Sequence, residues 1–218
     1  MVIDMLLKEI YTEYDYNIEV TGVQTDSRFV KPGNLFLPIK GKNFEGDEFF
    51  IDAITKGAVA IVYDKEINNL TIPVIIVDNL EKELLRLIDL IYEKPYNELT
   101  MIGVTGTDGK TSVSTLTSYL LNHLSRCANI GTNGIIYDKE IIDNVFTTPI
   151  LTQNYSLLRE FSNLGISYVS MEVSSQGIAN KRIEGILYDY AIFTNLSHEH
   201  LDTHKTCLLY TSPSPRDA

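Results

Sequence analysis

One stretch constrains what this chain can fold into more than any other, the glycine-rich segment from Gly103 to Thr111. An apolar run over residues 99–104 leads into it, and apolar residues at helical spacing follow it. Glycines let a backbone curl until its N–H groups converge on a phosphate, and the first turn of a helix adds partial positive charge. Lys110 then reaches the terminal phosphates, and Thr111 offers a hydroxyl to Mg²⁺. The segment therefore predicts a strand, a phosphate-binding loop and a helix that hold a nucleoside triphosphate.

The loop is a variant of the common nucleotide-binding pattern, which has a glycine at the position of Val104. The segment here reads T-G-T-D-G-K-T. The alternative is a tight glycine turn with Lys110 simply exposed, but the strand and helix expected on either side favour phosphate binding. We assign nucleotide contacts to the consecutive residues Gly106, Thr107, Asp108, Gly109, Lys110, Thr111 and Ser112.

The charge of the chain argues against two classes of partner. Its 218 residues carry 18 Lys and Arg against 29 Asp and Glu, a formal net charge of −11. Nucleic acids and anionic membranes require clustered cations, so we expect neither to bind. Asp4 stands where a secretion signal carries positive charge, and no apolar run has the length of a membrane span. Two cysteines, Cys127 and Cys207, make no disulfide framework, and we expect a cytoplasmic monomer.

Residues 1–97 read as a small α/β domain. Short β-branched runs bounded by Gly, Pro or Asn predict buried strands, and helical spacing predicts helices between them. The predicted strands cover residues 35–39, 58–63 and 74–77, and the predicted helices cover residues 47–56 and 81–92. Phe50, Ile51 and Ile54 should share one face of the first helix. Pro95 disfavours helix in the residue before it, so we place the domain boundary after residue 97.

Residues 98–206 read as a second domain built on the phosphate-binding loop, incomplete at its carboxyl end, with a mainly parallel sheet. After the loop, apolar residues at helical spacing mark one face of a helix: Val113, Leu116, Leu120 and Leu124. A further helix is predicted over residues 151–164 and a buried strand over 166–173, and another apolar run covers residues 190–194. The fold class is therefore α/β.

Glu172 lies near the carboxyl end of the predicted strand over residues 166–173. By itself, an acid at a strand end is most often an ordinary surface residue. Beside a phosphate-binding loop, however, it lies in the crevice where open parallel sheets bind ligands. Mg²⁺ prefers oxygen ligands, so the sequence predicts that Glu172 contributes to a metal site.

Three of the four histidines, His198, His200 and His204, fall within seven residues, together with Glu199 and Asp202. Zinc is one interpretation, but the spacing is not that of the His-Glu-x-x-His zinc motif. We prefer a polar loop at a strand end that contributes Mg²⁺ or nucleotide contacts.

The last residues, 207–218, do not continue the α/β pattern. Their Ser and Pro content is typical of a disordered or artefactual tail. An α/β domain does not normally stop just after a strand-end loop. We therefore expect a non-native tail after Thr206, on a natural protein that is longer.

Several separated stretches together resemble one family. They are Thr25-Asp26-Ser27-Arg28 with Pro32 to Phe36, the loop from Thr105 to Thr111, Thr147-Thr148-Pro149, Met171 to Ser175, and Phe193 to Ser197 with His200-Leu201-Asp202. The chain resembles the Mur ligases, ATP-dependent enzymes that form amide bonds in peptidoglycan assembly. It looks most like the type that adds the third residue to UDP-N-acetylmuramoyl-L-alanyl-D-glutamate. Composition alone favours a capped turn at Thr25 to Arg28.

The resemblance implies roles for individual residues. Lys110 and Thr111 would bind ATP and its metal, while Glu172 and His200 would bind Mg²⁺; Lys110, Glu172 and His200 would be catalytic. Ser27 would contact the uridine-diphosphate sugar. The muramoyl-peptide substrate would be held by Thr147, Thr148, Ser175, Asn180 and Arg182.

The implied chemistry is activation of the D-glutamyl carboxylate by ATP, through an acyl phosphate that the amine of a free amino acid then attacks. A further domain that binds this amino acid would lie beyond Thr206, so we expect the 218 residues alone to be inactive. The identity of the amino acid, diaminopimelate or lysine or another, does not follow from the sequence.

Some residues depart from the family pattern: Asp108 replaces the usual Asn and adds negative charge near the triphosphate, and Asp47 replaces a His. These departures leave a non-catalytic nucleotide-binding protein as one alternative. Another amide ligase of the superfamily is the other.

Overall fold

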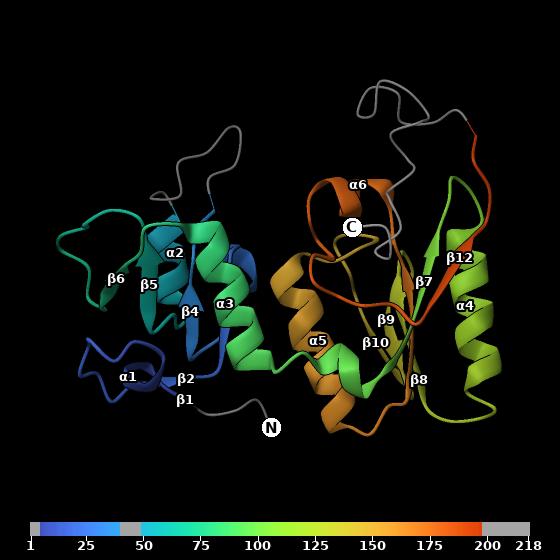
Figure 1. Ribbon diagram of the computed structural model, residues 1–218, viewed down its shortest axis with the longest axis horizontal. Helices are drawn as coiled ribbons and strands as arrows, with labels where there is room; N and C mark the ends of the chain where they lie inside the picture. The colour runs from blue at the N-terminus through green and yellow to red at the C-terminus, as the bar shows by residue number, and fades with distance from the viewer. Residues whose placement is uncertain (1–4, 40–48, 198–218) are drawn as a thin grey trace. The chain divides into compact units, whose positions relative to one another are not determined.

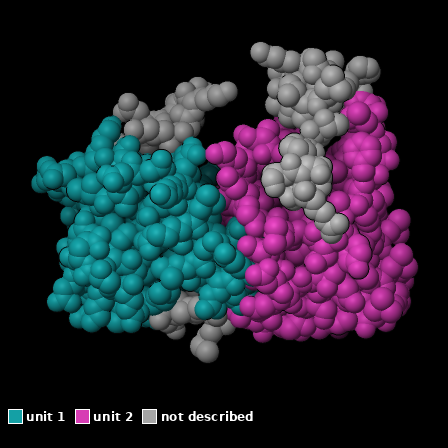
Figure 2. Space-filling view, in the orientation of Figure 1, with its two compact units in different colours: residues 1–94, 155–160 teal, residues 95–154, 161–218 magenta. Residues whose placement is uncertain are grey.

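The computed structural model describes residues 5–39 and 49–197 of the chain (Figure 1). The chain forms two compact units, residues 1–94 with 155–160 and residues 95–154 with 161–218 (Figure 2). Each unit has its own sheet. The cavity described below lies within the second unit.

The first unit is built on a parallel sheet whose strand order is β3-β4-β5-β6. Its strands are β3 (Gly22–Gln24), β4 (Asn34–Phe36), β5 (Ala60–Tyr63) and β6 (Val74–Ile76). A short antiparallel pair joins β1 (Met5–Leu6) to β2 (Glu19–Val20). The other elements are α1 (Leu7–Ile10), the 3-10 helix η1 (Ser27–Phe29), α2 (Phe50–Thr55) and α3 (Leu80–Tyr92). The three strands predicted in this unit are confirmed, with slightly different bounds.

The two predicted helices of the first unit have different outcomes. Helix α3 matches its prediction: Asn79 caps its first turn through the N–H of Lys82, and its apolar face is buried. Helix α2 covers only part of the predicted range, of which residues 47 and 48 lie outside the described residues. Ile51 is 67% exposed, so its predicted place beside Phe50 is wrong. Ala53 is buried with Phe50 instead, and Ile54 packs against the same core as a partly buried residue.

The second unit contains a larger sheet, and among the described residues its strand order is β10-β9-β8-β11-β7-β12. The strands are β7 (Thr100–Thr105), β8 (Cys127–Gly131), β9 (Gly134–Tyr137), β10 (Glu140–Ile142), β11 (Tyr168–Glu172) and β12 (Tyr190–Phe193). Strands β8, β11, β7 and β12 run parallel, whereas β9 and β10 form an antiparallel extension. The helices are η3 (Pro95–Glu98), α4 (Lys110–Leu121), α6 (Ser175–Ala179) and both ends of α5 (Leu151–Asn163), whose residues 155–160 belong to the first unit. The α/β fold and the mainly parallel sheet are thus confirmed.

Helices α4 and α5 lie on opposite sides of this sheet (Figure 1). Helix α4 packs against β8, β11 and β7, but not through the face predicted from the sequence. Leu116 and Leu120 are 60% and 63% exposed, and Leu124 lies beyond the helix end and is also exposed. Ser114 and Ser118 face the sheet instead. Small side chains allow this close approach, and the hydroxyl of Ser170 on β11 donates to the carbonyl of Ser114 at 3.0 Å.

Because β8, β11, β7 and β12 are parallel, their carboxyl ends meet at one edge of the sheet. The register pairs Glu172 of β11 with Val104 of β7. The glycine loop after β7 and the turn after β8 therefore both lie beside Glu172. This edge positions the candidate site.

Candidate functional site

The glycine loop connects β7 to α4 in the conformation that a phosphate cradle requires. Gly106 and Gly109 have φ angles of +135° and +80°, in the region that favours glycine. A Cβ on Gly106 would also lie 2.1 Å from the Thr194 hydroxyl oxygen. Helix α4 begins at Lys110, immediately after Gly109, so its first N–H groups point into the loop. The local geometry is that of an anion-binding helix start.

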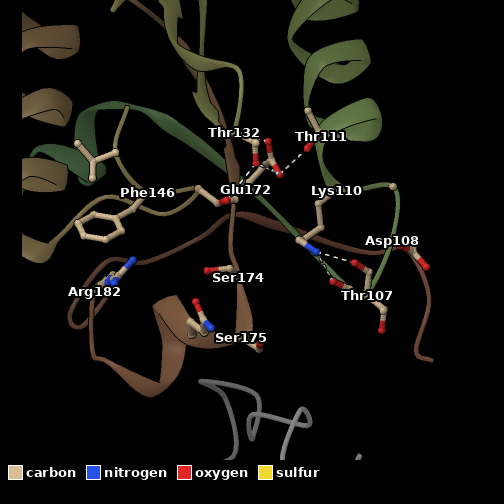
Figure 3. Close-up of a pocket in the computed structure, with 15 residues that line it drawn as sticks. Thr107, Asp108, Lys110, Thr111, Thr132, Phe146, Glu172, Ser174, Ser175 and Arg182 are labelled. Atoms are coloured by element: carbon tan, nitrogen blue, oxygen red, sulfur yellow. Dashed lines mark hydrogen bonds between the residues drawn. The ribbon is translucent and has the colours of Figure 1, made fainter. Parts of the chain in front are cut away.

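The ammonium of Lys110 folds back over this loop. It donates to the carbonyl oxygens of Gly106 and Thr107, each at 2.7 Å (Figure 3). An ammonium carries three protons, and two of them are used in these contacts. The loop thus holds the cation at the place where terminal phosphates lie in sites of this kind.

Residues after β12 fasten the loop from the other side. The Thr194 hydroxyl donates to the Asp108 carbonyl at 2.7 Å, and the Asp108 N–H donates to Asn195 Oδ1 at 3.0 Å. The N–H of Ser197 donates to the Thr107 hydroxyl at 2.9 Å. These contacts use the backbone of Asp108 and leave its side chain exposed. Figure 3 shows the side chains of Asp108 and Glu172 well apart, so the extra charge at this position lies at the rim.

Glu172 ends β11 and is only 1% exposed. Its Oε2 accepts the Thr111 hydroxyl at 2.9 Å, and its Oε1 accepts the N–H of Thr132 at 2.8 Å. A buried carboxylate needs such donors to offset its lost hydration. The carboxylate and the Thr111 hydroxyl present hard oxygen atoms beside the phosphate loop, and this donor set fits Mg²⁺.

The opposite wall of the cavity carries a second cation, Arg182 (Figure 3). Its guanidinium lies 4.1 Å from the ring centre of Phe146 and donates to the Thr148 carbonyl at 3.0 Å. Partial burial lowers the pKa of Arg182, which still remains a cation at neutral pH. The stacking and the hydrogen bond fix one face of the guanidinium, which suits it to hold an anion in one orientation.

These two walls enclose a cavity of about 500 Å³. Its lining contains Gly106, Thr107, Asp108, Gly109, Lys110, Thr111, Thr132, Val145, Phe146, Thr147, Glu172, Ser174, Ser175, Gln176 and Arg182. Lys110 and Thr107 lie on one side, Arg182 and Phe146 on the other, and Glu172 between them (Figure 3). The cavity therefore has room for a polyphosphate at one cation and a second anionic group at the other.

Some predicted site residues do not line this cavity. Thr148 is fully buried, and its hydroxyl donates to the Glu172 carbonyl at 2.9 Å and accepts the N–H of Ser174 at 2.9 Å. Ser112 and Asn180 are exposed, the first on α4 and the second just after α6. Their assigned contacts stay predictions, and the geometry of Thr148 favours a supporting role.

Two further predictions fall elsewhere in the chain. Ser27 begins η1 in the first unit and is 3% exposed, and Asp26 caps this helix by accepting the N–H of Arg28 at 3.0 Å. The capped turn expected from composition is thus present. His200, with its histidine neighbours, lies outside the described residues, as do Asp47 and the predicted tail.

Sequence reasoning missed several residues of the lining, chiefly Thr132 and Phe146. Thr132 follows β8 inside the sequence Gly131-Thr132-Asn133-Gly134, a turn after a buried parallel strand. That pattern is the signal that could have found it, because such turns lie at the ligand-binding edge. Phe146 carries no comparable signal.

Comparison with known families identifies the fold. The profile of the Mur ligase middle domain matches residues 104–212, which is 109 of the 218 residues. The chain belongs to the Mur ligase family. A second profile, for the Mur ligase family catalytic domain, matches residues 19–89.

Individual relatives of this Mur ligase chain include two curated enzymes. It is 38% identical over 215 residues to the UDP-N-acetylmuramoyl-L-alanyl-D-glutamate–2,6-diaminopimelate ligase of a Haemophilus influenzae strain, covering 94% of this chain and 44% of the relative. It is 42% identical over 191 residues to UDP-N-acetylmuramyl-tripeptide synthetase 2 of Oceanobacillus iheyensis, covering 85% of this chain and 38% of the relative. The chain thus spans less than half the length of these relatives.

Solved structures show the same fold. A structure of a UDP-N-acetylmuramoyl-L-alanyl-D-glutamate–2,6-diaminopimelate ligase matches with a TM-score of 0.69 at 26% identity, over 96% of this chain and 43% of that one. A MurF ligase from Thermotoga maritima, in complex with ADP, matches with a TM-score of 0.59 at 24% identity, over 87% of this chain and 40% of that one. None of the helices in the described part of this chain has both the length and the apolar composition for crossing a membrane.

Proposed function

We propose that this Mur ligase chain carries the ATP-dependent, carboxylate-activating part of a ligase that adds the third amino acid to UDP-N-acetylmuramoyl-L-alanyl-D-glutamate. The observation that carries the proposal is the two-sided cavity, with Lys110 and Thr111 at one wall and Arg182 at the other. A site that only binds a nucleotide needs the first wall alone. A reaction between ATP and an anionic second substrate needs both.

The residues of the first wall bind and orient the nucleotide in this proposal. The loop N–H groups and Lys110 hold the phosphates, which neutralises charge as the γ-phosphoryl group transfers. Thr111 and Glu172 would hold Mg²⁺, as would His200, which lies outside the described residues. Bound Mg²⁺ would neutralise phosphate charge. Because the contacts above preorganise these groups, catalysis rests on positioning and on neutralisation of phosphate charge.

The second wall holds the peptide substrate. Arg182, Ser175 and Thr147 line it, and Arg182 is oriented toward an anionic group by its contact with Phe146. The D-glutamyl carboxylate oxygen would attack the γ-phosphorus; one P–O bond forms, the bond to ADP breaks, and an acyl phosphate results. The amine of the amino acid would then attack the acyl carbon, forming the C–N bond, releasing phosphate and losing a proton. No nucleophilic side chain is needed for either step.

Ser27 completes the proposal as a contact to the uridine-diphosphate sugar, with Thr148 and Asn180 as further substrate residues. The names of the relatives support the dipeptide as substrate, but leave the third amino acid open between diaminopimelate and other residues. A cytoplasmic location belongs to this proposal because the reaction consumes ATP.

The test separates ligation from simple nucleotide binding. Isothermal titration calorimetry with Mg²⁺ and a non-hydrolysable ATP analogue should show binding to the 218-residue chain. In a protein extended to the full length of these relatives, ATP with UDP-N-acetylmuramoyl-L-alanyl-D-glutamate and a free amino acid should release ADP, and ATP alone should not. The control variant Lys110→Met should lose both signals. Nucleotide binding with no dipeptide-dependent ADP would contradict the ligase proposal and favour a non-catalytic nucleotide-binding protein.

A further inference from the structure

The turn after β8 is built around the Glu172 carboxylate. The Thr132 N–H donates to Oε1 at 2.8 Å, and the Thr132 hydroxyl lies 3.4 Å from Oε2. A Cβ on Gly131 would lie 2.1 Å from Oε1, a distance that no real Cβ contact allows. Gly131 has no positive φ, so the glycine serves this close approach and not a special backbone conformation.

The same hydroxyl also contacts a residue on the wall assigned to the peptide substrate. Thr132 Oγ1 lies 3.0 Å from Thr147 Oγ1, and both residues line the cavity. Thr147 stands on the wall assigned to the peptide substrate, whereas Glu172 stands at the phosphate loop. The Thr132 side chain is therefore hydrogen-bonded to both sides of the site.

The hydrogen bonds that link Thr147, Thr132 and Glu172 have a defined direction. A carboxylate only accepts, and a hydroxyl has one proton to donate. If Thr132 donates to Glu172, the 3.0 Å contact must be donated by Thr147. The lone pairs of the Thr147 oxygen then face the cavity, and they suit a ligand N–H or O–H group. A ligand carboxylate or phosphate oxygen there would instead need the Thr147 proton, and the hydrogen bond from Thr147 to Thr132 would be lost.

We propose that Thr132 is a positioning residue that holds Glu172 for the nucleotide and, through Thr147, couples the nucleotide site to an amide N–H or hydroxyl of the second substrate. This inference rests on the proposed function, because it takes its two ligands from there. Thr132 itself does not contact the reacting atoms. Its effect is to keep the carboxylate oriented when the second substrate is bound.

The experiment measures binding of Mg²⁺ with a non-hydrolysable ATP analogue to the 218-residue chain, with and without saturating UDP-N-acetylmuramoyl-L-alanyl-D-glutamate. Thr132→Val removes the hydroxyl and keeps both the shape and the N–H contact. It should weaken nucleotide binding about 3- to 10-fold and abolish the change in affinity caused by the dipeptide. Thr132→Ser should restore both. Thr147→Val should weaken dipeptide binding and abolish the coupling, and the double variant should add nothing further to the loss of coupling.

A matched control is Thr115→Val on α4, because the buried Thr115 hydroxyl has no hydrogen-bond partner among the described residues. It should leave nucleotide affinity and coupling at wild-type values. If wild type binds both ligands and Thr132→Val does the same with unchanged coupling, the positioning role is wrong while the proposed function stands. If Thr132→Ser behaves like Thr132→Val, the methyl group matters and the hydroxyl relay is wrong. If wild type binds no nucleotide, the proposed function is wrong, and so is the positioning role of Thr132 that rests on it.

Discussion

Gly131 offers a direct way to displace the Glu172 carboxylate without altering its chemistry. Replacing Gly131 by alanine adds one methyl group, which in the present geometry would lie 2.1 Å from Glu172 Oε1. The backbone of Gly131 needs no positive φ, so alanine brings no conformational penalty of its own. The turn backbone is fixed by pairing of Gly131 with Gly134 across β8 and β9. The carboxylate must therefore move.

The cost follows from the bonds that this movement breaks. Glu172 would lose the 2.8 Å bond from the Thr132 N–H and strain the 2.9 Å bond from the Thr111 hydroxyl. A hydrogen bond to a charged group contributes about 1.5–3 kcal/mol. We expect Gly131→Ala to weaken binding of Mg²⁺ with an ATP analogue about 10- to 100-fold, since 1.4 kcal/mol corresponds to about a factor of ten.

The assay is calorimetric titration of four chains: wild type, Gly131→Ala, Glu172→Ala and the double variant. Glu172→Ala removes the atoms that the new methyl group would strike, so Gly131→Ala should add little in that background. An equal loss in both backgrounds would show that the turn itself, and not the carboxylate, is disturbed. Wild-type affinity in Gly131→Ala alone would refute the claim that Glu172 must keep this position to bind the metal and nucleotide.

Three further predictions test other parts of the chain. Lys110→Arg should not preserve nucleotide affinity, because a planar guanidinium cannot replace an ammonium bound to two carbonyl oxygens at 2.7 Å; titration should show a loss of about tenfold or more, and wild-type affinity would contradict it. Arg182→Lys removes the stacking on Phe146 and should weaken dipeptide binding about 3- to 10-fold, with nucleotide affinity unchanged. A loss of nucleotide affinity instead would show that Arg182 belongs to the nucleotide site. Burial raises the pKa of Tyr92 from 10.0 to about 12. The unfolded chain therefore loses this proton first as pH rises, and the contribution of Tyr92 to stability, present below pH 10, falls by about 3 kcal/mol between pH 10 and 12. Urea unfolding at several pH values should show a shallower alkaline loss for Tyr92→Phe, and an identical slope would show that Tyr92 is not responsible.

Much of the candidate site was predictable because its central part is local in sequence. The segment from β7 through the loop to α4 is continuous, so glycine spacing, Lys110 and Thr111 could be interpreted without knowing the rest of the fold. Glu172 could be predicted because the carboxyl ends of neighbouring parallel strands meet at the edge of the sheet where the phosphate loop lies. Whether Asp108 obstructs the phosphates could not be decided this way, because that depends on Thr194 and Asn195, which turn its backbone inward and its side chain outward.

The helical faces show where periodicity fails. Leucines at helical spacing in α4 indicate an apolar face, yet the helix turns Ser114 and Ser118 toward the sheet. Periodicity tells which residues share a side of a helix. It does not tell how closely that side approaches a neighbour, and at close approach small side chains are preferred.

The sequence by itself thus determined the phosphate loop, the α/β class and the acid at the end of β11, because each is encoded by a short run of residues. Only the tertiary structure decided what surrounds that acid. The strand order places β11 between β8 and β7. Thr132, which follows β8, and Thr111, which follows β7 and its loop, therefore both contact the Glu172 carboxylate. That meeting depends on the order of strands in space, and order in space is a property that no local pattern of residues specifies.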